Sequence, residues 1–479
     1  MTAGQTDHVD ALRALLGEKG LVAGGDLSAY ETGARYDHGR AAFVMRPATT
    51  AELSDAVAYC VRHGIAVIPQ SGNTGLVSGS TPDDTGSQAV LSLERMTTVY
   101  DIDPVNRTVR AGAGWRLSAL NERLDAHGLF FPIDLGADPM LGGMIATNTG
   151  GSRFLRYGDV RSNTLGLTTV LADTAGTVLD LGSGLRKDNT GIDWKQLFIG
   201  SCGALGVVTE CVLKLEPLPQ QSATTLLVPS SADAVPALLV AMERACGATL
   251  SAFEGMSGNA IRAAFAHVPS LRNPFENGNV PEFVILAELT RSNTAREGEQ
   301  PLDAMLEEVL AEIWENGEDL LADALMGPPQ EIWALRHALS DGVKNAGRLI
   351  AFDLAFRRGD VMKFLSHMKA ELAVAFPMLS VCDFGHLGDG GVHFNLVTPR
   401  DHAALAEPGF ETSVRDLVYS VAVERFDGSF SAEHGIGRKN QIYYDRFTPE
   451  VIRDLAARLK KAISPAPLGA ADFSNTITK

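Results

Sequence analysis

The sequence predicts an α+β protein with two domains and a further C-terminal segment. Its 479 residues exceed the usual size of one hydrophobic core. Short strand-like and helix-like segments alternate up to about residue 219, and longer helices follow from there to about residue 425. We therefore expect a first domain over residues 1–219, a second over residues 220–425, and a closing segment over residues 426–479.

Composition and charge narrow the class of protein. Hydrophobic residues make up 45% of the chain and charged residues 21%, which is typical of globular proteins. The formal net charge is −17 and no basic run is present, so we expect no nucleic-acid partner. No stretch approaches the roughly 20 apolar residues of a membrane helix, and residues 1–20 lack the pattern of a signal or transit peptide. The five cysteines include no CxxC pair, which indicates reduced thiols. We therefore expect a cytoplasmic protein without a transmembrane segment.

A helix and a strand are expected over residues 49–68. Thr49 and Glu52 form a capping box, so a helix should begin there, and the apolar spacing continues to Val61. The sequence IAVIP then predicts a strand that leads into the glycine-rich loop PQSGNTGL at residues 69–76. The glycines, hydroxyls and amide of this loop suit the wrapping of a pyrophosphate, and an ordinary turn is the alternative.

Two further segments are dense in glycine. Residues 136–159 contain more Gly, Thr and Asn than a connecting turn requires, so the backbone there should approach another group closely. Residues 198–210 place Gly200, Gly203 and Gly206 ahead of a β-branched strand, where a flat ring could lie against exposed amides.

Other nucleotide-binding motifs are incomplete. The turn RAGAGWRL has Gly112 and Gly114 but places Leu117 at the third glycine position of the dinucleotide fingerprint. The phosphate loop GxxxxGK[ST] is absent from the sequence. The sequence therefore supports neither NAD nor ATP binding.

Two histidines flank a predicted hairpin turn in VCDFGHLGDGGVHFNLV. Asp389 and Gly390 favour a two-residue turn, and folding about it makes His386 and His393 direct cross-strand partners. Such partners have Cβ atoms about 4.5 to 5.5 Å apart, which lets two imidazoles share one divalent metal. Asn395 should lie on the same face of the hairpin. A pair of hydrogen-bonded core histidines is the alternative.

A carboxylate and a third histidine come from SAEHGIGRKN, residues 431–440. Adjacent side chains generally diverge, so Glu433 could complete a two-histidine, one-carboxylate metal site while His434 faces a substrate as general base. The alternative is a structural glutamate at the start of a helix, capped by the histidine.

Five strings, in order along the chain, resemble the FAD-linked D-2-hydroxyacid dehydrogenases: PQSGNTGL, GGMIATNTGGSRFLRYGDVRSNTLG, LRKDNTGIDWKQLFIGSCGALGVVTE, FGHLGDGGVHFN and SAEHGIG. That family belongs to the vanillyl-alcohol oxidase and p-cresol methylhydroxylase (PCMH) superfamily, and the resemblance covers nearly the whole chain. It implies a two-part FAD-binding domain of the PCMH type and an α+β substrate (cap) domain with an antiparallel sheet. It also implies a C-terminal helical segment that returns to the flavin and completes the active site.

The resemblance implies a set of cofactor-binding residues in the glycine-rich segments. These are Pro69, Ser71, Gly72, Asn73, Thr74, Gly75, Ser78, Pro132, Gly142, Gly143, Thr147, Gly150, Gly206 and Val208. Some members of the superfamily attach the flavin through a histidine in the first loop, where this chain has Asn73. We therefore expect non-covalent FAD.

The resemblance also implies the reaction, in which a D-2-hydroxy acid becomes the 2-keto acid by hydride transfer to N5 of FAD. The implied ligands of a divalent metal, Zn or Mn, are His386, His393 and Glu433, and His434 is the implied base. Electrons would pass to an external acceptor, such as a quinone, a cytochrome or an electron-transfer flavoprotein, and the chain could form a homodimer.

An anionic substrate needs a local cation in a protein this acidic. The segment EIWALRHALSDGVKNAGR offers Arg336, Lys344 and Arg348, and a solvated helix face is the alternative. The resemblance selects Arg336 as the arginine that binds the substrate carboxylate. With His434 and Asn395 it makes up the implied catalytic set.

Several positions depart from the family pattern. Ser340 and Ala351 stand where relatives specific for 2-hydroxyglutarate tend to have Thr and Lys, so D-lactate or a larger 2-hydroxy acid is as well supported as D-2-hydroxyglutarate. Cys202 and Ala204 replace a frequent Glu and Thr near the flavin. Two other functions stay open at this point: a metal-free FAD-dependent alcohol or sugar oxidase, and a flavin-binding electron-transfer subunit.

Overall fold

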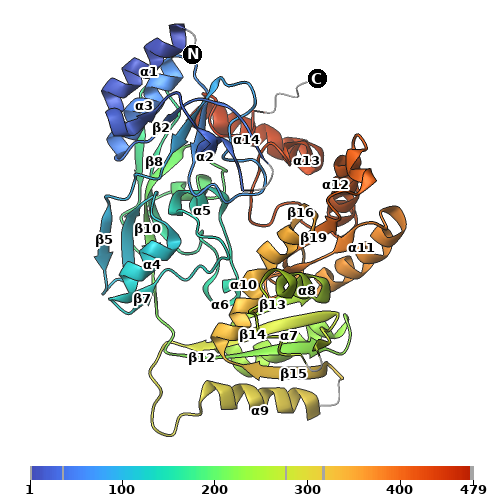
Figure 1. The fold of residues 1–479 in the computed structure, drawn as a ribbon. Helices are drawn as coiled ribbons and strands as arrows, with labels where there is room; N and C mark the ends of the chain where they lie inside the picture. The colour runs from blue at the N-terminus through green and yellow to red at the C-terminus, as the bar shows by residue number, and fades with distance from the viewer. Residues whose placement is uncertain (1–2, 35–36, 276–277, 316–318, 475–479) are drawn as a thin grey trace.

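The computed structural model describes residues 3–34, 37–275, 278–315 and 319–474. Figure 1 shows the N-terminal region in blue to green, a second domain below it in green to orange, and red C-terminal helices that lie beside the N-terminal region again. In the described part of the chain, no helix is both long enough and apolar enough to cross a membrane.

The chain begins with a four-stranded sheet that helices cover. Its strand order is β1 (Leu21–Val22), β2 (Ala41–Met45), β4 (Gln88–Ser92) and β3 (Val67–Gln70), with parallel pairing of β2, β4 and β3. The accompanying helices are α1 (Ala3–Leu16), α2 (Ser28–Glu31) and α3 (Thr50–Arg62). The Thr49 hydroxyl accepts from the Glu52 amide at 3.1 Å, and the Glu52 carboxylate accepts from the Ala48 amide at 2.7 Å. The predicted capped helix and the strand after it are therefore confirmed.

A five-stranded antiparallel sheet forms the second part of this domain. Its order is β5 (Tyr100–Asp103), β6 (Thr108–Gly112), β10 (Val207–Lys214), β8 (Thr164–Val170) and β9 (Val178–Leu181). Helices α4 (Leu117–Asp125), α5 (Leu141–Thr147) and α6 (Phe154–Tyr157) follow β6, and β7 (Leu129–Phe130) pairs with β11 (Glu216–Pro217). One hydrophobic core, which includes Phe43, Leu53, Phe131 and Leu213, joins the two sheets into a single unit.

The second domain is built on an eight-stranded antiparallel sheet. The order is β15 (Leu321–Gly327), β12 (Gln221–Pro229), β14 (Phe283–Arg291), β13 (Leu250–Ser257), β18 (Phe384–Gly385), β19 (Gly391–Thr398) and β16 (Arg348–Ala355), and β17 (Ser380–Val381) also pairs with β19. Successive strand residues point to opposite faces, so each face has its own hydrophobic core. One core contains α7 (Ala234–Cys246), α9 (Leu302–Glu315), α11 (Val361–Ala375) and α12 (Phe410–Ser420). The other contains α8 (Gly258–His267) and α10 (Pro329–Ala346).

The C-terminal helices, α13 (Gln441–Phe447) and α14 (Glu450–Ile463), lead back to the first domain (Figure 1). The buried ammonium of Lys460 in α14 donates to the Ala204 carbonyl at 2.7 Å. Leu468 forms a parallel bridge with Val67 of β3. The end of the chain thus packs against the third glycine-rich turn and the strand that precedes the first one.

An ion-pair network joins the first domain to the eight-stranded sheet of the second domain. Arg153, which precedes α6, lies 2.9 Å from Asp134 and 3.0 Å from Glu288 of β14. The buried Glu288 carboxylate also accepts from the Trp333 indole at 2.9 Å and from the Ser251 hydroxyl at 2.7 Å. Because Glu288 is removed from water, the ion pair with the arginine from the other domain compensates the cost of its burial.

We predict that Arg153→Met destabilises the protein by about 3 kcal/mol, because it leaves the Glu288 carboxylate buried without a cation. The matched control is Arg272→Met, which removes an exposed pair with Glu331 at 3.2 Å and should cost less than about 1 kcal/mol. Thermal unfolding of both variants measures the difference. Equal losses would contradict a stabilising role for the network.

Candidate active site

A cavity of about 530 Å³ lies between the glycine-rich segments and the antiparallel sheet. Its walls include eleven of the predicted cofactor-binding residues: Pro69, Ser71, Gly72, Asn73, Thr74, Gly75, Gly142, Gly143, Thr147, Gly206 and Val208. The predicted catalytic and metal-binding residues line the same cavity: Arg336, His386, His393, Asn395, Glu433 and His434. The fold therefore brings together side chains that are more than 300 positions apart in the sequence.

The first two glycine-rich segments meet at one end of this cavity. A Cβ atom on Gly72 would lie 3.0 Å from the Met140 amide nitrogen, and one on Gly143 would lie 3.2 Å from Cβ of Ser71. The Ser71 hydroxyl is buried and has no hydrogen-bond partner among the described residues. An unpaired donor that faces a cavity between glycines suits a phosphate oxygen.

Asn73 has a structural role in the first loop. Its backbone is left-handed, with φ of 53°. Its amide nitrogen donates to the Thr32 carbonyl, and its amide oxygen accepts from the Ser80 hydroxyl, both at 2.8 Å. An asparagine held in this way offers no nucleophile for covalent attachment.

The third glycine-rich turn contacts the C-terminal segment through Cys202. The Cys202 sulfur accepts from the Ile436 amide at 3.0 Å, and a Cβ atom on Gly435 would lie only 2.6 Å from that sulfur. Burial raises the pKa of the Cys202 thiol to about 11, so the thiol stays neutral. The departure from the family pattern at this position is therefore a neutral packing contact with the turn that carries Glu433 and His434.

His386 and His393 lie side by side, but the predicted hairpin register is wrong. Phe384, rather than His386, is the cross-strand partner of His393. The connection is longer than a two-residue turn, because the amides of Asp389, Gly390 and Gly391 all close on the His386 carbonyl at 3.0 to 3.2 Å. A shift of two residues keeps the same sheet face, so the two rings still approach, with centroids 5.3 Å apart and planes at 80°.

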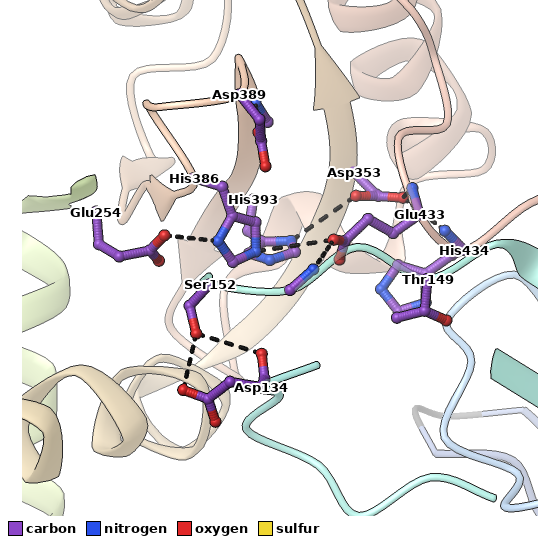
Figure 2. Close-up of polar contacts among 12 residues, drawn as sticks. Asp134, Thr149, Ser152, Glu254, Asp353, His386, Asp389, His393, Glu433 and His434 are labelled. Carbon is purple, nitrogen blue, oxygen red and sulfur yellow. Dashed lines mark hydrogen bonds and ion pairs between the residues drawn. The ribbon is translucent and has the colours of Figure 1, made fainter. Parts of the chain in front are cut away.

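Glu433 completes a group of three candidate metal ligands. Ligand atoms of His386, His393 and Glu433 all lie within 4.8 Å of one another. Figure 2 shows the two imidazoles facing the Glu433 carboxylate, which also accepts from the Gly151 amide at 2.9 Å. Two ring nitrogens and one carboxylate form a suitable set for a divalent transition metal.

Asp353 of β16 holds the turn that carries Glu433 and His434. One of its oxygens accepts from the backbone amides of both residues, at 2.7 and 2.9 Å. Its other oxygen lies 3.8 Å from Nδ1 of His393, its cross-strand partner (Figure 2). Sequence reasoning missed Asp353, although a single acid in the apolar strand RLIAFDLA was a signal.

Glu254 of β13 was also missed, although it gives the same signal as the only acid in the strand LSAFEGMS. One of its oxygens lies 2.8 Å from Nδ1 of His386, and the other accepts from Nε of Arg336 at 2.9 Å. Burial opposes charge on His386, but Glu254 outweighs burial and raises the pKa of the ring to about 10. Although burial favours the neutral acid, His386 and Arg336 outweigh it and lower the pKa of Glu254, so Glu254 is a carboxylate.

Helix α10 contributes cations to the cavity wall. Arg336 is buried, and its guanidinium lies 5.0 Å from the centre of the Phe384 ring. Lys344 also lines the cavity, about 12 Å further along the helix axis. Arg348 is outside the cavity wall, and its guanidinium lies 3.5 Å from the Glu411 carboxylate.

Three predicted cofactor-binding residues, Ser78, Pro132 and Gly150, do not line the cavity. Ser78 lies beyond the first loop in a left-handed conformation, with φ of 57°, and Pro132 is buried. Gly150 packs against a different group, since its Cβ atom would lie 2.6 Å from Oε1 of Glu433. This glycine therefore makes room for a candidate metal ligand.

Comparisons with known proteins agree with this architecture. Residues 41–182 match the model of an FAD binding domain, and residues 218–468 match the C-terminal domain of FAD linked oxidases. A rice (Oryza sativa subsp. japonica) protein named probable D-2-hydroxyglutarate dehydrogenase, mitochondrial, is 34% identical over 96% of this chain and 80% of its own. The bovine (Bos taurus) D-2-hydroxyglutarate dehydrogenase, mitochondrial, is 34% identical over 89% of this chain and 75% of its own. The solved structure of p-cresol methylhydroxylase with substrate bound superimposes with a TM-score of 0.72 at 16% identity, over 97% of this chain and 96% of that one.

The fold and the matches define a flavoprotein oxidoreductase with a PCMH-type FAD-binding domain and an antiparallel cap domain. The chain belongs to the family of FAD-linked oxidases, and its similarity to the rice and bovine proteins confirms the prediction of an FAD-dependent D-2-hydroxyacid dehydrogenase. The predicted cytoplasmic location is wrong, because these relatives are named as mitochondrial proteins.

We predict that Gly150→Ala weakens binding of Zn²⁺ or Mn²⁺ by about tenfold or more, because the new methyl group displaces the Glu433 carboxylate. A competition titration with a chromogenic chelator measures the affinity. Gly191→Ala is the control, since that glycine is exposed and its Cβ atom would meet nothing within 4 Å. Wild-type affinity in Gly150→Ala would show that Glu433 is not a ligand.

Proposed function

We propose that the protein oxidises a D-2-hydroxy acid to the 2-keto acid with non-covalent FAD and a divalent metal, Zn or Mn, held by His386, His393 and Glu433. The observation that carries this proposal is that the three candidate ligands, His434 and Arg336 face the same cavity as the glycine-rich segments. The names of the rice and bovine relatives support the same chemistry.

The glycine-rich end of the cavity fits FAD. The unpaired Ser71 hydroxyl and the close approach of Gly72 and Gly143 to neighbouring backbone suit a pyrophosphate. Asn73 is held by hydrogen bonds, which supports non-covalent binding. Bound FAD supplies the acceptor for the hydrogen that leaves C2 of the substrate with its electron pair.

The histidine end of the cavity fits a metal. Nδ1 of His386 contacts Glu254 at 2.8 Å, which directs Nε2 toward Glu433 at 3.9 Å. Bound metal supplies a Lewis acid that lowers the pKa of the substrate hydroxyl, as metals do for bound water.

His434 is the proposed general base. Asp353 fixes its backbone amide at 2.9 Å, and Gly435 follows with a left-handed φ of 69°. His434 lines the cavity next to Glu433, where its imidazole can take the proton from the substrate hydroxyl. Removal of that proton and loss of the C2 hydrogen together convert the C2–O single bond into the carbonyl of the 2-keto acid.

Arg336 is the proposed partner of the substrate carboxylate, and Asn395 is proposed to contact the substrate. The Asn395 amide donates to the His393 carbonyl at 3.1 Å, which places it beside the ligands. We favour a substrate with a second anionic group, D-2-hydroxyglutarate first, because Lys344 adds a second cation to the cavity wall and the relatives carry that name. The external electron acceptor and a homodimer stay predictions.

Anaerobic titration of the flavin tests this function. The absorbance of the bound flavin should bleach when a D-2-hydroxy acid is added and stay unchanged with its L-enantiomer. If no D-2-hydroxy acid in the panel bleaches the flavin, the proposed function is wrong. Bleaching by a simple alcohol or sugar would instead favour the metal-free oxidase.

We predict that His434→Asn slows flavin reduction by about 100-fold or more, because the variant lacks the proposed base. Stopped-flow absorbance measures the reduction rate, and the flavin content of the purified variant serves as its control for folding. An unchanged rate in a variant with full flavin content would exclude His434 as the base.

We predict that Lys344→Met raises the KM for D-2-hydroxyglutarate by about tenfold while the KM for D-lactate changes less than twofold, because only the longer substrate has a second carboxylate. Lys344→Arg is the matched control, since it keeps the charge. Equal changes for both substrates would place Lys344 outside the substrate site.

A further inference from the structure

We propose that Glu254 is a positioning residue that ties the metal site to the substrate-carboxylate site through a single carboxylate. This inference rests on the proposed function. Its side chain is 1% exposed, and each of its two oxygens serves a different residue of the site. No other residue in the described part of the chain contacts both His386 and Arg336 with charged atoms.

The first oxygen selects which nitrogen of His386 faces the metal. Oε1 of Glu254 lies 2.8 Å from Nδ1 of His386, so the proton belongs on Nδ1. Nε2 points toward Glu433, whose oxygen is 3.9 Å away (Figure 2), and a bound metal would take the place of the proton on this nitrogen. A carboxylate behind a ligating histidine fixes the tautomer and the ring orientation and increases the basicity of the ligand.

The second oxygen holds Arg336. Oε2 of Glu254 accepts from Nε at 2.9 Å and lies 2.7 Å from Nη2. The Phe384 ring, 5.0 Å away, packs against the guanidinium. With Nε and Nη2 engaged, Nη1 remains for a ligand in the cavity. Arg336 can thus bind a substrate carboxylate without free rotation of its side chain.

Strand pairing makes this arrangement rigid. Gly255 and Met256 of β13 pair with Gly385 and Phe384 of β18, which seats Glu254 directly beside the start of the His386 loop. The Gly388 amide of that loop donates to the Phe253 carbonyl of β13 at 3.1 Å. The position of His386 relative to Glu254 is therefore set by backbone hydrogen bonds on both sides of Glu254.

This geometry explains why one acid serves two partners. A 2-hydroxy acid offers a hydroxyl and a carboxylate on adjacent carbons, so the groups that bind them must keep a fixed separation. A carboxylate whose two oxygens are joined by one carbon atom imposes that separation. It also compensates the charge of Arg336 next to a metal that adds further positive charge.

The test is Glu254→Gln, which keeps the shape but offers only one acceptor oxygen. We expect the affinity for Zn²⁺ or Mn²⁺ to fall about 10- to 100-fold in a chelator competition titration, independently of turnover. We also expect the KM for the D-2-hydroxy acid to rise at saturating metal by about tenfold or more. The FAD content should equal that of the wild type, because Glu254 is not among the residues that line the cavity.

The matched control is Glu288→Gln in the neighbouring strand. Glu288 is equally buried and accepts from Arg153, Trp333 and Ser251, but contacts none of the candidate metal ligands. The Glu288→Gln variant should lower the midpoint of thermal unfolding at least as much as Glu254→Gln. Its affinity for Zn²⁺ or Mn²⁺ should stay within about twofold of that of the wild type.

Wild-type metal affinity in Glu254→Gln would overturn the proposal. Equal losses of metal affinity in the two variants would also overturn it, because Glu254 would then act only through stability. Failure of the proposed function is seen separately, in a wild-type protein that binds no divalent metal or whose flavin no D-2-hydroxy acid reduces.

Discussion

Two buried carboxylates hold the candidate active site together. Glu254 fixes His386 and Arg336, and Asp353 fixes the backbone of Glu433 and His434. Both lie in strands of the antiparallel sheet, whereas the groups they hold come from a loop, a helix and the C-terminal turn. Together with backbone hydrogen bonds, these carboxylates keep side chains from distant parts of the sequence at ligand distance. The sheet therefore fixes the positions of the two carboxylates, and the carboxylates fix the residues of the candidate site that they contact.

The site is also a junction between domains. The Gly151 amide, from the segment that follows α5, donates to Glu433 at 2.9 Å, and Gly150 leaves space for the same carboxylate. Nearby, Arg153 joins that segment to Glu288 of the cap sheet. The candidate metal ligand Glu433 and the second glycine-rich segment are thus parts of one hydrogen-bonded assembly. This arrangement explains how a hydride donor and a flavin acceptor could be kept in register across a domain boundary.

Local patterns predicted much of this structure. The capping box of α3, the glycine-rich segments and the pair of histidines have sequence signatures, and each was recognised. The predicted pairing of β18 with β19 was wrong by two residues. The His386 carbonyl accepts hydrogen bonds from three amides, and the turn is therefore longer than predicted. The prediction that His386 and His393 lie close together still held, because strand side chains alternate with a period of two and a shift of two residues keeps the same face.

Other features could not be predicted from local patterns. Glu254, Asp353 and Arg153 are single charged residues, and their partners are fixed only by tertiary packing. Gly150 resembled a cofactor contact, although its neighbour is Glu433.

Metal analysis of the purified flavoprotein tests most directly whether His386, His393 and Glu433 hold a metal. We predict one divalent ion per chain in the wild type and a loss of that ion in His393→Asn at unchanged flavin content. Equal metal content in the two proteins would contradict it.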